Sequence, residues 1–257
     1  MEVAPGQDPS RDAVLQEMEN DLLTLLNMTA TVLVRVKRPP PVSGSVSRLK
    51  RKDPVASALP AHSPFGAVTT GQTLARRIEQ RSRGLLLETS LTAIQQSRID
   101  RTLQSALDLL CALQAARYAW QIALLLPLEG PSGRDALPHL KRVTEQAIEM
   151  NSRVAFAIEG KEGAGAAVAD QYRAYWAVKE ETAVHFHELR ESGTLSQTAR
   201  RLVRAALWSV TVAAESMAKA AARFTLPLGA ARAATKEQQE FRHLDRGDDL
   251  LAPLPRR

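Results

Sequence analysis

Residues 150–170 read MNSRVAFAIEGKEGAGAAVAD, and this stretch sets the organisation of the second half of the chain. Its glycine-containing turn separates two long amphipathic segments, which predict helices over about 135–159 and 164–191. Another short turn separates the latter from a predicted helix over about 195–226. Because such short links hold consecutive helices side by side and antiparallel, the second half is predicted to be an up-down-up three-helix bundle.

The first half of the chain shows the same order of three long amphipathic segments. Apolar residues at helical spacing predict helices over about 9–36, 73–94 and 97–126. Ser97 and Asp100 have the spacing of a capping box, which marks the predicted start of the third helix. The fold class predicted from both halves is therefore all-α.

Residues 37–72 separate the first two predicted helices and differ from both in composition. They are rich in proline, serine, glycine and basic residues, with too few periodic apolar positions to build a packed element, so we predict a flexible basic insertion. Its candidate partner-binding residues are Arg48, Lys50, Arg51 and Lys52. With the basic residues just before it, the insertion forms a positive arm over 35–52 that suits phosphate-bearing partners, a membrane surface or nucleic acid. The alternative is a solvating loop.

Two helix ends echo each other across the chain. The third and sixth predicted helices end in Leu-Pro-Leu, at residues 126–128 and 226–228, and both approach that end through a stripe of alanines. The match suggests an internal repeat. The predicted domains are accordingly a bundle over 1–129, a homologous bundle over 130–229 and a partly flexible tail over 230–257.

The bulk composition is that of an ordinary globular protein with a surplus of basic residues. The 257 residues include 34 Lys and Arg against 28 Asp and Glu, which gives a formal net charge of +6. The two signs are mixed along most of the chain, as on solvated helix surfaces. No uncharged apolar run approaches the roughly 18 residues that a membrane span requires, and the first residues do not resemble a signal peptide. We expect a cytoplasmic protein.

Few residues carry recognisable chemistry. Cys111, the single cysteine, lies in an apolar run and is predicted to be a small core residue. His185 and His187 are two residues apart on a predicted helix, so their side chains diverge and do not share a metal ion. Glu181 lies one turn from His185, but no second helix supplies the Glu-x-x-His partner that a di-iron bundle requires. We expect no catalytic residue, no cofactor, no bound metal and no enzymatic activity.

Aromatic residues make up only 4% of the chain, and those on the predicted helices are expected in the core or at an interface. We single out Trp176 as a candidate partner-binding residue. Exposure of Trp176 or Tyr175 in the monomer would indicate a dimer contact. A homodimer is the expected assembly.

Two segments resemble the PhoU family of phosphate-uptake regulators. The third predicted helix matches the Tyr-Ala-x-x-Ile-Ala part of the family motif at Tyr118, Ala119, Ile122 and Ala123. The sixth carries a degenerate form of the motif over 212–224, followed by Gly229. The resemblance covers most of the chain outside 37–72 and 230–257. It implies two tandem, homologous three-helix bundles that regulate a phosphate ABC transporter and a sensor kinase through protein contacts.

The carboxylates that hold metal ions in this family, spaced four residues apart, are mostly missing here. The matching positions carry Leu113 and Arg117, Glu180 and Val184, and Thr211 and Glu215. Because Arg117 would repel a cation, metal binding does not carry over from the family.

The sequence thus predicts a PhoU-like, non-catalytic regulator of phosphate uptake or phosphate signalling. Two alternatives stay open. One is a nucleic-acid-associated helical protein that uses the arm over 35–52, with an affinity that falls steeply as salt rises. The other is a metal-dependent helical-bundle protein, which would carry stoichiometric iron, manganese or zinc.

Overall fold

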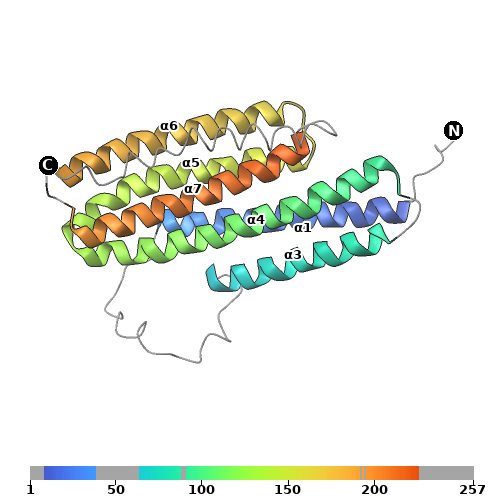
Figure 1. Cartoon of the computed structure of the whole chain (residues 1–257), viewed down its shortest axis with the longest axis horizontal. Helices are drawn as coiled ribbons and strands as arrows, with labels where there is room; N and C mark the ends of the chain where they lie inside the picture. Colours follow the sequence, from blue (N-terminus) through green and yellow to red (C-terminus); the bar gives the residue numbers. More distant parts are fainter. Residues whose placement is uncertain (1–8, 39–63, 88–90, 192, 194, 226–257) are drawn as a thin grey trace, which may run out of the picture.

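The computed structural model describes residues 9–38, 64–87, 91–191, 193 and 195–225. These residues form six α-helices and one short 3-10 turn, with no strand among them (Figure 1). The elements are α1 (Pro9–Lys37), α3 (Pro64–Leu86), α4 (Ala93–Leu125), η2 (Leu126–Glu129), α5 (Pro131–Ile158), α6 (Ala164–Glu191) and α7 (Gln197–Thr225). The all-α prediction is confirmed.

Helices from both halves of the chain meet in the middle of the molecule. Helices α1, α3 and α4 contact one another, as do α5, α6 and α7. Between the halves, α4 packs against α7 and α1 packs against α5, whereas α3 and α6 lie on opposite outer sides (Figure 1). The buried apolar residues form one continuous core that draws on all six helices.

The contact between α4 and α7 is the most extensive of all helix pairs. Both helices bury alanines where they pack, including Ala112, Ala116 and Ala119 in α4 and Ala213, Ala214 and Ala220 in α7, each without exposed surface. Small side chains let the two helices approach closely, and the Ser105 hydroxyl donates to the carbonyl of Ala220 at 3.2 Å. The alanine stripes noted in the sequence therefore serve the centre of the fold.

Charged residues join α1 to its neighbours at the edges of this core. Arg77 in α3 donates from Nε to Asp21 Oδ2 at 2.7 Å. Arg98 in α4 donates from Nη2 to Glu19 Oε2 at 3.0 Å. Both carboxylates are nearly buried. Because a buried charge is costly without a partner, each of these ion pairs is needed for the packing seen here.

Two predicted boundaries in the first half are wrong. Helix α3 begins at Pro64, so the last nine residues of the predicted insertion are helical, and Ala67 and Val68 in that stretch are buried. The insertion was predicted from its proline, serine and basic residues, and the short apolar stripe at the start of α3 was given too little weight. Helix α4 begins at Ala93 and not at about residue 97, because the capping box is formed by Thr92 and Gln95. At the other end of the predicted insertion, Lys37 belongs to α1, and residues 39–63 lie outside the described residues.

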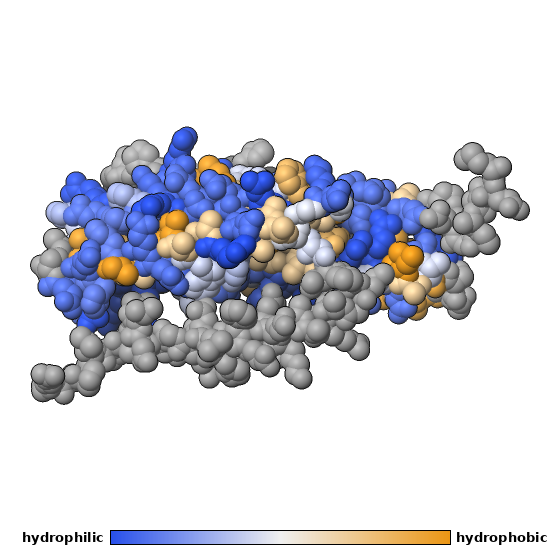
Figure 2. Space-filling view, turned by 90° about the horizontal axis from the view of Figure 1, so that it is seen from above, coloured by the Kyte–Doolittle hydropathy of each residue, from blue (hydrophilic) through white to orange (hydrophobic). Residues whose placement is uncertain are grey.

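Among the described residues, the stretch Ala93–Glu129 is long and apolar enough to cross a membrane by length and composition alone. It consists of α4 and η2, and α4 packs against α1, α3 and α7. The core helix of a folded bundle passes the same test, and 44% of the apolar window is buried inside the structure. Viewed from the α6 side, the surface is largely hydrophilic, with separate hydrophobic spots (Figure 2).

Candidate functional site

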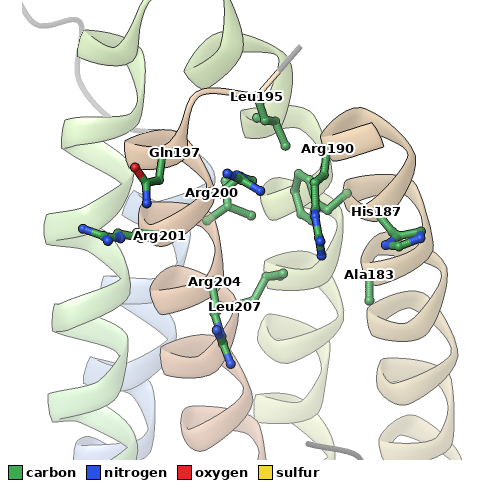
Figure 3. Close-up of a pocket in the computed structure, with 11 residues that line it drawn as sticks. Ala183, His187, Arg190, Leu195, Gln197, Arg200, Arg201, Arg204 and Leu207 are labelled. Carbon is green, nitrogen blue, oxygen red and sulfur yellow. The ribbon is translucent and has the colours of Figure 1, made fainter. Parts of the chain in front are cut away.

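A cleft lies between the last turns of α6 and the first turns of α7, with a volume of about 510 Å³ (Figure 3). Its basic lining residues are His187, Arg190, Arg200, Arg201 and Arg204, and its apolar ones include Phe186, Leu195, Val203 and Leu207. The site therefore combines positive charge with an apolar surface. We refer to it below as the arginine cleft.

Helical spacing brings these side chains to one place. Arg200, Val203, Arg204 and Leu207 follow one another at intervals of three, one and three residues, so they share one face of α7. Phe186 and Arg190 are four residues apart and share a face of α6. The side chains of Arg190 and Arg200 extend into the space between the two helices, whereas Arg201 points away from α6 (Figure 3).

The turn before α7 fixes the first residues of that helix. The backbone N–H of Ala199 donates to Ser196 Oγ at 3.0 Å, as at a capped helix start. Leu195, in the same turn, is buried and lines the cleft beside Phe186 and Val203, which are 8% and 4% exposed. The base of the cleft is therefore formed by well-packed residues, while the guanidinium groups of α7 reach solvent.

The charges of the cleft set it apart from the rest of the molecule. Within the described residues, no carboxylate forms an ion pair with Arg190, Arg200, Arg201 or Arg204. Two carboxylates lie nearby: Glu191 Oε1 is 3.6 Å from His187 Nε2, and Glu129 Oε2 accepts a hydrogen bond from Ser196 Oγ at 3.3 Å. Elsewhere, Arg77, Arg98 and Arg223 each bind a carboxylate on a neighbouring helix. The cleft is consequently a local centre of positive potential that attracts anions.

A second group of titratable side chains lies between α5 and α6, next to the cleft. His139 in α5 stacks on His185 with ring centroids 3.9 Å apart, and Phe186 meets His139 edge-on at 5.7 Å. Burial, and then the proximity of His185, lowers the pKa of His139 below its usual 6.5. In the described part of the chain, no three His, Cys, Asp or Glu side chains are grouped as a metal ion requires.

Of the sequence-predicted site residues, Trp176 is the one that the structure describes. Arg48, Lys50, Arg51 and Lys52 lie outside the described residues, so their role stays a prediction. Trp176 is half-buried on α6, where its ring contacts Tyr175 edge-on and lies 3.4 Å from Lys179 Nζ. Tyr175 is fully buried. Neither residue therefore provides the exposed aromatic surface on which the dimer contact was predicted.

The aromatic residues that are exposed lie elsewhere. Trp208 on α7 is 70% exposed and Tyr118 on α4 is 56% exposed. Trp208 follows Arg204 by one helical turn, so it lies beside the arginine cleft. A signal for Trp208 was available in the sequence, because Arg201 and Arg204 lie seven and four residues before it and mark a solvated face of the helix.

The prediction of a buried Cys111 is wrong. Cys111 is exposed, although Leu109, Ala112 and Leu113 around it are fully buried. Successive residues of a helix point in different directions, so an apolar run does not place each of its members in the core. Cys111 belongs to the outward face of α4.

No family model, no curated protein and no solved structure matches this chain. The resemblance to the PhoU family stays a prediction.

Proposed function

We propose that the protein is a PhoU-like, non-catalytic regulator of phosphate uptake or phosphate signalling that acts by binding a partner protein. One observation carries this proposal: corresponding helices of the two halves face each other, α1 with α5 and α4 with α7, while α3 and α6 stay outside. Two tandem three-helix bundles related by a repeat would pack in this way. The buried alanines of the resembling motif, Ala119 and Ala123, lie in α4 at this junction.

The exposed face of α7 is the surface on which we place the partner. Tryptophan and arginine are the residue types that contribute most often to binding energy at protein interfaces. Trp208 is 70% exposed, and Arg201 and Arg204 lie seven and four residues before it on the same helix. A large exposed indole costs solvation in the free protein and suits burial under a partner.

The test uses the purified full-length chain with two candidate partners, the ATPase subunit of a phosphate ABC transporter and the cytoplasmic part of a phosphate sensor kinase. We expect binding to at least one. Trp208→Ala should weaken it by about thirtyfold or more, the factor for a loss of about 2 kcal/mol. Val184→Ala, at an exposed apolar residue of α6, is the matched control and should change the affinity little.

Failure of both partners to bind, at concentrations where a PhoU-family member binds them, would refute the proposal. Equal losses in the Trp208 and Val184 variants would refute the placement of the partner on α7. Light scattering on the same sample tests the homodimer that belongs to the proposal, because one chain has a mass of 28.1 kDa.

A further inference from the structure

We propose that the arginine cleft binds an organic polyphosphate, a small molecule with two or more phosphate groups on an apolar or aromatic body. The inference rests on the residues of the cleft and does not depend on the regulatory function proposed above. It follows from four features of the site: the number of its charges, their convergence from two helices, its apolar base and its size.

The charge of the cleft calls for more than one negative group. Arg190, Arg200 and Arg204 contribute three positive charges at the cleft, whereas Arg201 points away from α6 (Figure 3), and the described residues supply no carboxylate paired with any of them. Guanidinium is always protonated, so these charges are not relieved by loss of a proton. A single carboxylate would leave two of them unmatched and a single phosphate at least one, whereas a diphosphate or triphosphate would balance them.

The geometry of the arginines suits phosphate in particular. Arg190 comes from α6 and Arg200 from α7, and both extend into the space between the helices (Figure 3). Planar guanidinium groups bind phosphate oxygens through paired N–H donors. Guanidinium groups that approach from two sides can contact different phosphates of the same polyphosphate ligand.

The base of the cleft selects a ligand with an apolar part. Phe186, Leu195 and Val203 are buried beneath the arginines and offer no hydrogen-bonding groups to an inorganic anion. Ala183 and Leu207, which also line the cleft, are only half-buried, so a planar ring or aliphatic segment placed there removes their apolar surface from water.

The size of the cleft favours a small molecule over a polymer. A volume of about 510 Å³ lies within the range of roughly 300–1,000 Å³ that is usual for small-molecule sites. Among the residues that line it there is no Trp or Tyr on which successive bases of a nucleic acid strand would stack. The structure therefore points to a compact ligand of the nucleotide type.

Isothermal titration calorimetry of the full-length chain tests the proposal, with ATP, sodium tripolyphosphate, adenosine and orthophosphate as probes at fixed ionic strength without magnesium. We expect ATP to bind most tightly, tripolyphosphate more weakly, and adenosine and orthophosphate at least about a hundredfold more weakly than ATP. If tripolyphosphate binds as tightly as ATP, the apolar part of the proposal is wrong. If ATP does not bind at millimolar concentration, the proposal as a whole is wrong.

A matched pair of variants separates a built site from general attraction to a basic protein. Arg190→Ala combined with Arg200→Ala should weaken ATP binding by about thirtyfold or more, since two charge-assisted contacts are lost. Arg76→Ala combined with Arg153→Ala removes the same formal charge from exposed positions of α3 and α5 and should leave the affinity within about twofold. Equal losses in both variants would overturn the assignment of the site. Circular dichroism shows that each variant is folded, and the absence of a partner protein keeps this test separate from that of the proposed function.

Discussion

A hydrogen bond between α6 and α7 should couple Tyr175 and Thr211 energetically. Tyr175 is fully buried, and its hydroxyl donates to Thr211 Oγ1 at 2.8 Å. The Thr211 hydroxyl in turn donates to the carbonyl of Leu207 at 2.8 Å. Burial raises the pKa of the Tyr175 phenol, which therefore stays protonated and keeps its role as a donor. The three groups form a chain that crosses the contact between the two helices.

The cost of each substitution follows from the partner that it leaves behind. Tyr175→Phe removes the donor, but Thr211 keeps its bond to Leu207, so unfolding should become easier by about 0.5–1.5 kcal/mol. Thr211→Val leaves the buried phenol without an acceptor and should cost about 1–3 kcal/mol. The double variant leaves no unsatisfied group of the pair, and its cost should fall short of the sum of the single costs by about 1 kcal/mol.

Urea denaturation followed by circular dichroism at 222 nm measures these free energies of unfolding, and unchanged slopes against urea show that the comparison is valid. Thr144→Val is the matched control, because Thr144 is also buried but donates only to Leu140 within its own helix, at 2.7 Å. Its effect should add to that of Tyr175→Phe within about 0.5 kcal/mol. If the Tyr175 and Thr211 substitutions are equally additive, the bond between the helices does not contribute as argued.

Four further predictions test other parts of the structure. The pKa of His139 is lowered in the fold, so the unfolded chain takes up a proton at a higher pH than the folded one. The free energy of unfolding should therefore fall as pH drops below about 6.5, and it should fall less in His139→Gln. Parallel pH profiles of the two proteins would contradict this prediction. Gly84→Ala should raise the free energy of unfolding by about 0.5–1 kcal/mol, because nothing lies within 4 Å of the added methyl group in helix α3. Gly71→Ala, whose methyl group would lie 2.5 Å from Leu113 Cδ2, should lower it by about 1–3 kcal/mol in the same urea assay, and a stabilised Gly71 variant would contradict the packing. Cys111 should react with a thiol reagent as completely in the native protein as in denaturant, whereas protection would mean that α4 is rotated.

Proline and glycine made several helix boundaries predictable. The sequence predicts helices over about 9–36 and 164–191, and the structure shows Pro9–Lys37 and Ala164–Glu191. Pro9 begins the first, and Gly163, with φ of 73°, precedes the second. Helix boundaries at residues with such strong backbone preferences can be predicted without knowledge of the tertiary structure.

The sequence contains the signal for the start of α4, but the start was predicted at the wrong residue. Thr92 and Gln95 have the Thr-x-x-Gln spacing of a capping box, and the structure forms both of its hydrogen bonds, at 3.2 and 3.1 Å. Ser97 and Asp100 offered a similar spacing one turn later. Choosing between two such signals requires knowledge of which residues face the core, and Gln95 and Ile99 are the buried ones.

The arginine cleft was not predicted, for a physical reason. Arg200, Arg201 and Arg204 look in the sequence like the solvated face of an amphipathic helix, and Arg190 belongs to a different helix. Only the turn between α6 and α7 and the rotation of each helix bring them to one opening. The signal that was available is the dense run of arginines directly after a short turn, because such a turn places the adjoining ends of both helices close together.

The two uses of arginine in this molecule bear on what the cleft is for. Arg77, Arg98 and Arg223 bind carboxylates on neighbouring helices and so contribute to the packing of the bundle. The cleft arginines form no such ion pair in the described part of the chain, and those of α7 are exposed to solvent. Their guanidinium groups therefore contribute no contact of this kind to the packing of the bundle. This difference supports the proposal that the cleft binds an anion, because a ligand would supply the missing negative charge.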